Sequence, residues 1–482
     1  MLVWKIQTLN INVASLRYRC LLPLRYLSHH GLESKIYGGL ATVKLTPQTK
    51  AIIFVKSFHH ADVATCKRAY QQGVPIILDL CDNIFIEGYG ADSDHIAAQN
   101  FQIMAQMADV IVTTGTAMKA EVEKALSIEQ VPDEQVSDEQ VSDEQVPDEQ
   151  VSELAHSSHP HSNHSQTAPR VITIPDGSES LEDIQFAFKS TKWARAFKQA
   201  TKPLHVARRL YKEGRHAAKV ALCDAGLLSP KEIPPEHTAT GHLTCPNPTH
   251  TKHANKSSKK PKKNKSQPTP LRPKPWPPAP GVKTVLWFGN HGAKYGNFGM
   301  LNILDVADAL QAVNASCSLR LMVISNHREK YEADIAPLPF ETDYLRWHPL
   351  KIYDYIRASD VVIIPNSQSR YSICKSANRA VLALSQGTPV VASRTPALDG
   401  LKGCVWLDDW EGGLREYLLN PQVGEAHVEQ AQQLIAQTLS GEAIAQKWLT
   451  LLDQIGAYPS EAYPSGTHSS ISKHSAGERN PA

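Results

Sequence analysis

The sequence predicts an α/β protein made of two folded halves, because short apolar runs alternate with helical stretches in two separate parts of the chain. The apolar runs are continuous rather than alternating, which is typical of parallel strands buried on both faces. Segments of strongly biased amino-acid composition interrupt this alternation of strands and helices. The 482 residues, 41% of them hydrophobic, are enough for about two to three domains.

The first half covers residues 1–127 and resumes at 168–182. Its apolar runs "AIIFVK", "PIILDL" and "ADVIVTT" predict strands over 51–56, 75–80 and 108–114. Helical stretches lie between them, around 60–72 and 94–107. A further strand is expected in "RVITIPDGSE", where it ends at Asp-Gly.

The two parts of the first half are separated by an insertion, residues 128–167. It contains four copies of a five-residue unit, "VPDEQVSDEQVSDEQVPDEQ", followed by a His-rich stretch. This period fits neither a helix nor a strand, and the unit is acidic and carries proline. We therefore expect a disordered insertion.

A basic segment, residues 183–282, follows the first half. It begins with aromatic residues among lysines and arginines, and it ends as a Lys/Pro linker. One hypothesis is peripheral contact with an anionic membrane through 183–275. The plainer interpretation is one or two solvated basic helices. Nucleic-acid binding is not expected, because lysine runs in linkers are usually only solvated.

The second half covers residues 283–455. The runs "KTVLWFG", "LRLMVIS", "DVVIIP" and "PVVAS" predict its strands, and a helical stretch over about 424–454 closes it. The tail, 456–482, looks disordered.

Several protein classes are excluded by composition. The eight cysteines are scattered without a CxxC pair, which argues against a zinc ribbon or a disulfide scaffold. No apolar run reaches the length of a membrane span, and no signal-peptide pattern is recognised. We expect a cytoplasmic protein, with contact at the inner face of the membrane left open, and no metal or other cofactor.

The stretch "KSANRAVLALSQGTPVVAS" offers the strongest candidate site. Lys375, Asn378 and Arg379 have the i, i+3, i+4 spacing of one helix face, opposite an apolar face, and Ser376 lies among them. The helix follows the end of a strand, where α/β proteins bind ligands. Free N–H groups and two cations there would suit a diphosphate. The alternative is a solvated polar face.

A second candidate is the glycine-rich stretch "VLWFGNHGAKYGNFG", which includes Gly289, Asn290 and Lys294. Glycines let backbone N–H groups approach a phosphate closely. The stretch matches neither common phosphate-loop pattern, so a plain glycine-rich turn remains the alternative.

Two further groups lie in the first half. Ser15, Arg17 and Arg19 fall early in a helix, where arginine opposes the helix dipole and indicates an anion or an acidic partner; a solvated helix face is the alternative. Asp79 and Asp82 fall at a strand's carboxyl end, where they are candidates for catalysis or for simple turn capping.

The order of these motifs, from "ASLRYR" and "LDLCDN" to "LWFGN", "ASDVVIIP" and "KSANRAVLALSQGTPVVAS", resembles glycosyltransferases of the GT-B fold. The sequence is most similar to the bacterial group related to glycosyltransferase family four (glycosyl transferase group 1). The resemblance spans about residues 1–180 and 283–455, and it is most specific over 358–393.

The resemblance implies two Rossmann-like domains facing across a cleft. The second would bind a nucleotide-diphospho-sugar donor, and the first an acceptor, through Ser15, Arg17 and Arg19. It implies a hexosyltransferase of polysaccharide or cell-envelope glycan synthesis with a glycan or lipid-linked acceptor. The donor contacts would come from seven residues: Gly289, Asn290, Lys294, Lys375, Ser376, Asn378 and Arg379.

The sequence departs from that family at several positions. Family-four enzymes usually carry two glutamates before the Gly-Thr-Pro, and Cys374 and Leu382 stand there. The usual Asn-Gly after the strand is Asp176-Gly177. A non-catalytic nucleotide-sugar-binding protein and a GT-B sugar-nucleotide epimerase therefore stay open as alternatives, as do the base, the sugar and the stereochemical outcome.

Overall fold

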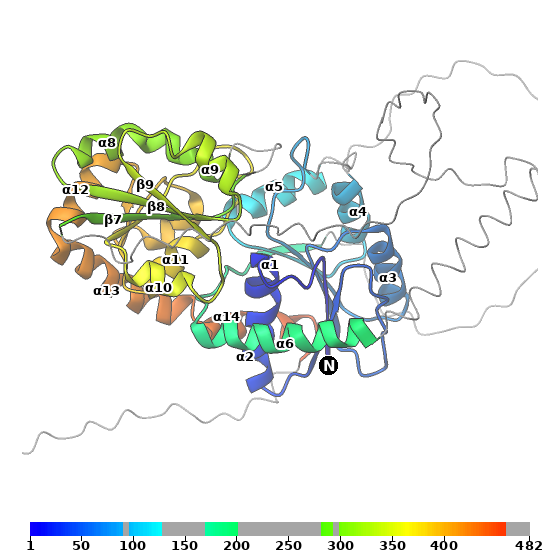
Figure 1. Cartoon of the computed structure of the whole chain (residues 1–482). Coiled ribbons are helices and arrows are strands. Elements are labelled where there is room, and N and C mark those ends of the chain that lie inside the picture. The colour runs from blue at the N-terminus through cyan, green and yellow to red at the C-terminus, as the bar shows by residue number, and fades with distance from the viewer. Residues whose placement is uncertain (90–95, 128–168, 201–280, 293–297, 459–482) are drawn as a thin grey trace, which may run out of the picture. The chain divides into compact units, whose positions relative to one another are not determined.

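The computed structural model describes residues 1–89, 96–127, 169–200, 281–292 and 298–458 (Figure 1). Within α6, side chains are described only to residue 191. The predicted disordered insertion, most of the basic segment and the tail lie outside these ranges, so those predictions stay untested.

The first half is built on a six-stranded parallel sheet in the order β2-β1-β3-β4-β5-β6. Its central strands are fully buried, as their uninterrupted apolar runs predict. The order changes direction between β1 and β3, which are paired from Leu2↔Ala51 to Ile6↔Val55. The strands are β1 (Leu2–Ile6), β2 (Ser34–Gly38), β3 (Ala51–Val55), β4 (Ile76–Leu80), β5 (Val110–Thr113) and β6 (Arg170–Thr173).

The second half contains another six-stranded parallel sheet, in the order β12-β11-β10-β7-β8-β9. Here the order changes direction between β7 and β10, which is the place in open α/β sheets where ligands commonly bind. The strands are β7 (Lys283–Phe288), β8 (Leu319–Ser325), β9 (Glu341–Arg346), β10 (Val361–Ile364), β11 (Val390–Ala392) and β12 (Trp406–Leu407).

Helices connect the strands and cover both sheets, which confirms the predicted α/β class. The first half has α1 (Ala14–Leu16), the π-helical turn η1 (Arg17–Leu21), α2 (Leu22–His29), α3 (His60–Gln71), α4 (Ile96–Ala105), α5 (Thr116–Ser127) and α6 (Leu181–Ala200). The second has η4 (Met300–Val306), α8 (Ala307–Asn314), α9 (Arg328–Asp334), α10 (Ile352–Arg357), α11 (Asn378–Ser385), η5 (Pro396–Leu401), α12 (Trp410–Leu419) and α13 (Pro421–Thr438). In the described ranges no helix is both long and apolar enough to cross a membrane.

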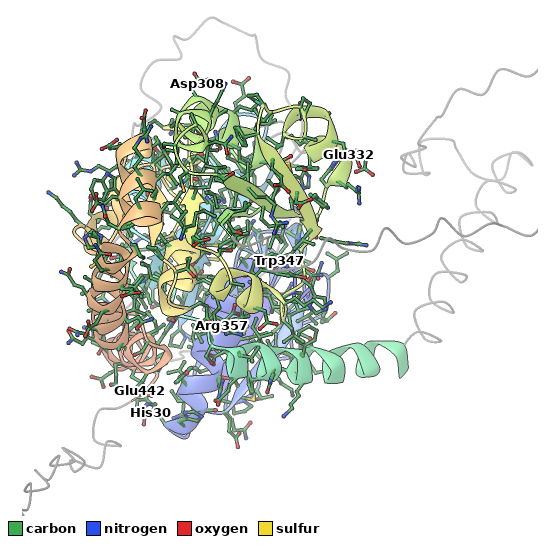
Figure 2. The ribbon with its side chains drawn as sticks, turned by 60° about the vertical axis from the view of Figure 1, so that its left-hand side comes forward. His30, Asp308, Glu332, Trp347, Arg357 and Glu442 are labelled. Atoms are coloured by element: carbon green, nitrogen blue, oxygen red, sulfur yellow. The ribbon has the colours of Figure 1, made fainter. Side chains whose placement is uncertain are left out.

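The last helix, α14 (Gly441–Gln454), was predicted as part of the second half but packs into the core of the first. Trp448 meets Trp4 of β1 edge to face, with ring centroids 5.4 Å apart. Next to this contact, His30 and Glu442 lie side by side (Figure 2), with 2.7 Å between Nε2 and Oε1. The chain thus returns to its first sheet, which ties the two halves together.

We expect Trp448→Ala to destabilise the protein by about 3–5 kcal/mol, because it leaves a cavity in the first core. Urea unfolding measures this loss. Leu419→Ala is the matched control, because Leu419 is an exposed apolar residue of α12, and it should cost less than about 0.5 kcal/mol. Equal costs for the two variants would contradict the packing of α14.

Candidate functional site

The segment between β10 and α11 lies against loops at the carboxyl ends of the first sheet. The Asn83 amide, after β4, donates to the Arg370 carbonyl at 3.2 Å, and the Thr114 hydroxyl, after β5, to the Cys374 carbonyl at 3.4 Å. Cys374 itself belongs to the core cluster of the first half. The carboxyl ends of both sheets therefore meet at this segment, which is where ligands bind in open α/β sheets.

Lys375 lies ahead of α11 rather than on its face, because the helix begins at Asn378. The predicted shared helix face is therefore wrong for Lys375. Its ammonium group binds Asp82 Oδ1 and donates to the Tyr371 hydroxyl at 2.7 Å, and it lies 3.9 Å from the centroid of that ring. Both Lys375 and Asp82 thus lie where the halves meet, not on the outer surface.

A second lysine, Lys56, binds the other oxygen of the same carboxylate, Asp82 Oδ2. Lys56 directly follows β3 and has a left-handed backbone with φ of 48°. Burial alone would raise the pKa of Asp82, but Lys375 and Lys56 outweigh it and hold that pKa well below its ordinary value. Asp82 is therefore ionised at neutral pH, and the three groups together carry one net positive charge.

The start of α11 is also tied to a buried charge network in the first half. Ser376 Oγ donates to Asp176 Oδ2 at 2.6 Å, and Asn378 Nδ2 lies 3.4 Å from the same oxygen. The other Asp176 oxygen accepts from Arg19 Nη1 at 3.2 Å. Arg19 also makes a bidentate pair with Asp79, at 3.0 and 2.7 Å. Ser376 and Asn378, which belong to the second half, are thus held by a carboxylate of the first half.

Arg379 is the cation of this region that has no carboxylate partner in the part of the chain that the structure describes. Its guanidinium donates to Asn366 Oδ1 at 2.8 Å and approaches the Phe288 carbonyl at 3.5 Å. Phe288 ends β7 and Asn366 follows β10, so Arg379 lies at the carboxyl ends of the two strands between which the order changes direction. Desolvation lowers the pKa of Arg379 to about 10, so the side chain is charged at neutral pH.

The glycine-rich loop after β7 lies next to Arg379. A side chain at Gly289 would place its Cβ 3.3 Å from Arg379 Nη1, a tight contact that glycine avoids. Asn290 is exposed, and its side chain accepts from the Gly292 N–H at 2.9 Å, which shapes the turn. Lys294 lies outside the described residues. The predicted donor contacts at Gly289 and Asn290 stay predictions.

The arginines predicted on the acceptor side are buried. Arg17 pairs with Glu179 at 2.9 Å, and Arg19 with Asp79 and Asp176. The acidic partners that the sequence analysis inferred therefore lie within the chain. Ser15 is partly buried at the start of this segment. Their role toward an acceptor stays a prediction, and Arg17 and Arg19 have a structural task that occupies their guanidinium groups.

Asp79 and Asp82, predicted together, have different environments. Asp79 lies within β4 and is completely buried against Arg19, whereas Asp82 lies beyond the strand between two lysines. Burial raises the pKa of Asp79, and the charge of Arg19 only partly offsets this. Sequence reasoning missed Lys56 and Asp176 as site residues. The available signal was their position after a strand: Lys56 directly follows β3, and Asp176 lies three residues beyond the end of β6.

Among the described residues no group of three or more histidines, cysteines or acids has the arrangement of a metal site. The described part of the site therefore offers cations and amides to a ligand, a set suited to an anion.

No known family model and no curated protein matches this sequence. Solved structures do match. Sucrose-phosphate synthase from Thermosynechococcus elongatus superposes with a TM-score of 0.51 at 12% identity, over 95% of this chain and 99% of that chain. A glycosyltransferase from Rickettsia africae superposes with a TM-score of 0.47 at 9% identity, over 94% of this chain and 98% of that chain. Anabaena HepE, solved with UDP and glucose, reaches 0.45 at 10%, over 94% and 99%.

At 12% identity, the similarity to sucrose-phosphate synthase, with a TM-score of 0.51, concerns the fold alone. Two all-parallel six-stranded sheets, joined by contacts between their carboxyl-end loops and by the return of α14, make up this architecture. The chain has the GT-B fold.

Proposed function

We propose that this protein is a glycosyltransferase that takes a hexose from a nucleotide-diphospho-sugar. The observation that supports it best is Arg379, a partly buried guanidinium that has no acidic partner among the described residues and lies at the carboxyl ends of β7 and β10. A charge left unpaired within a protein is costly, so an anionic ligand is its natural partner. A diphosphate matches the charge and the planar donor geometry of arginine.

The hard step of such a transfer is departure of the nucleoside diphosphate, which gains negative charge as the glycosidic bond breaks. In this proposal Arg379 and Lys375 stabilise that charge, and the N–H groups at the start of α11, which begins at Asn378, add to their effect. Asp176 holds Ser376 and Asn378 in position from the first half. Ser376 and Asn378 are therefore held before reaction, and preorganised groups of this kind lower a barrier most.

We propose further that the acceptor, a glycan or a lipid-linked saccharide of polysaccharide or cell-envelope synthesis, binds on the side of the first half. The family resemblance and the position of this half's carboxyl-end loops support this. Association with a membrane surface through residues 183–275 belongs to the same proposal.

The first test is thermal unfolding of the full chain with inorganic pyrophosphate and with a panel of nucleotide sugars. We expect pyrophosphate and one nucleotide-sugar class to raise Tm, since any ligand that binds only the native state stabilises it. Release of free nucleotide then reports turnover. Absence of stabilisation by every compound would refute a diphosphate site.

A non-catalytic nucleotide-sugar-binding protein is the second candidate. Cys374 and Leu382 stand where relatives carry glutamates, and they are only 3% and 4% exposed. Burial raises the pKa of Cys374 to about 11, so the thiol is neutral and cannot replace a carboxylate. Binding of a nucleotide sugar without any nucleotide release would favour this candidate.

A further inference from the structure

Lys56, Asp82 and Lys375 form a chain of charges in which each carboxylate oxygen has its own lysine. Lys375 binds Oδ1 and comes from the donor side, whereas Lys56 binds Oδ2 and belongs to the first half. The side chains are 33% exposed for Lys375, 18% for Lys56 and 11% for Asp82. Lys375 is thus the lysine that is free to change partners.

A diphosphate that binds Lys375 competes with Asp82 for the same ammonium group, and it gains the full charge of that group only if Lys375 leaves Asp82. Removing one partner of a buried ion pair is strongly unfavourable when the other charge is left alone. Asp82 is not left alone here, because Lys56 keeps its own contact with the second oxygen. One carboxylate shared by two lysines therefore allows one lysine to depart.

We propose that Lys56 is a positioning residue that acts through Asp82: it neutralises the carboxylate and so releases Lys375 for the donor's diphosphate. This rests on the proposed function. Asp82 then acts as the resting counter-ion of Lys375, not as a group that touches the sugar. Lys56 contributes to donor affinity without contacting the donor.

The backbone conformation of Lys56 supports the view that its side chain is held on Asp82. A φ of 48° is uncommon for a residue with a side chain, and it persists where surrounding contacts hold it. The Lys56 N–H donates to the Asp79 carbonyl at 2.9 Å, and its ammonium lies 5.9 Å from the centroid of the Tyr89 ring. These contacts fix Lys56 on Asp82, while Lys375 has its alternative contact at the Tyr371 hydroxyl.

The first experiment needs no ligand and measures Tm for Lys56→Met, Lys375→Met and the double variant. Either lysine alone compensates Asp82, so each single variant should lose little. The Tm of the double variant should fall by at least about 5 °C more than the two single losses added together, because the Asp82 carboxylate then has no lysine partner. Adding Asp82→Asn should restore most of that loss. Additive losses would overturn the shared-carboxylate arrangement.

The second experiment measures the affinity for inorganic pyrophosphate by calorimetry. Lys56→Met should weaken binding on the order of tenfold, about 1.4 kcal/mol, because Lys375 is then retained by Asp82. Asp82→Asn should bind at least as tightly as the unaltered chain. Lys56→Met combined with Asp82→Asn should match Asp82→Asn alone within about threefold. Lys56→Arg keeps the charge and should retain affinity, and Lys67→Met, on the exposed face of α3, is the neutral control.

The outcomes separate the two proposals. If the unaltered chain binds pyrophosphate but the Lys56→Met defect persists with Asp82→Asn, Lys56 contacts the anion directly and only this inference is wrong. If the unaltered chain does not bind pyrophosphate at all, the proposed diphosphate site and this inference both fall.

Discussion

Arg379→Ala should lower the turnover of the nucleotide sugar by roughly 10²- to 10³-fold, the loss typical of removing one preorganised donor from a developing anion. Arg379 has no carboxylate partner in the described ranges, so its removal leaves no unpaired acid behind. The folded state should therefore keep its stability or gain some. Loss of function without loss of Tm distinguishes a ligand-binding arginine from a structural one.

The measurement is kcat/KM together with thermal unfolding for the same preparations. Arg357→Ala is the matched control, because Arg357 is an exposed arginine of α10 in the same half (Figure 2) and pairs with Asp354. It should leave kcat/KM within about twofold, as expected for a surface substitution. Arg379→Lys should recover only part of the activity, since an ammonium cannot donate in the bidentate geometry of a guanidinium. Full turnover in Arg379→Ala would remove the main support for the proposed function.

The central strands could be predicted from the sequence because burial on both faces leaves an unbroken apolar run. Edge strands carry a weaker signal: "SKIYG" and "ETDYLR" are only partly buried and mix polar with apolar residues, so β2 and β9 were missed. The amphipathic pattern of α14 predicted a helix but not its destination. Periodicity reports that a face is buried, and it does not report which core buries it.

Local sequence pattern singled out Arg379, because a helix was expected to follow the carboxyl end of a strand. Its contact with the loop at Gly289 was not predicted. The partners of Lys375 were not predicted either, because Asp82 and Lys56 lie about 300 residues away in sequence and no local pattern connects them. For the same reason, the sequence predicted an anion or an acidic partner for Arg19 but not which one, because its pairs with Asp79 and Asp176 depend on the folded first sheet.

Arg19→Ala should destabilise the protein by about 3–5 kcal/mol, because it strands two carboxylates inside the first half. Asp79 is completely buried and Asp176 nearly so, and Arg19 is the cation between them. Arg68→Ala is the matched control, since Arg68 is exposed on α3 and makes no ion pair in the described part of the chain. It should cost less than about 0.5 kcal/mol in urea unfolding. Equal costs would contradict the network.

The loss in Arg19→Ala should depend on pH in a defined direction. Burial already raises the pKa of Asp79 above its unfolded value, and removing Arg19 raises it further. A carboxyl group with a raised pKa in the folded state favours folding while it is protonated, and that contribution is lost as the pH rises through the folded pKa. The loss of unfolding free energy in Arg19→Ala should therefore be smaller at pH 5 than at pH 8, and Arg19→Met with Asp79→Leu should recover much of it.

Because Asp176 also holds Ser376 and Asn378, Arg19→Ala should weaken pyrophosphate binding even where the variant is fully folded. An unchanged affinity would mean that the start of α11 keeps its geometry without the first half.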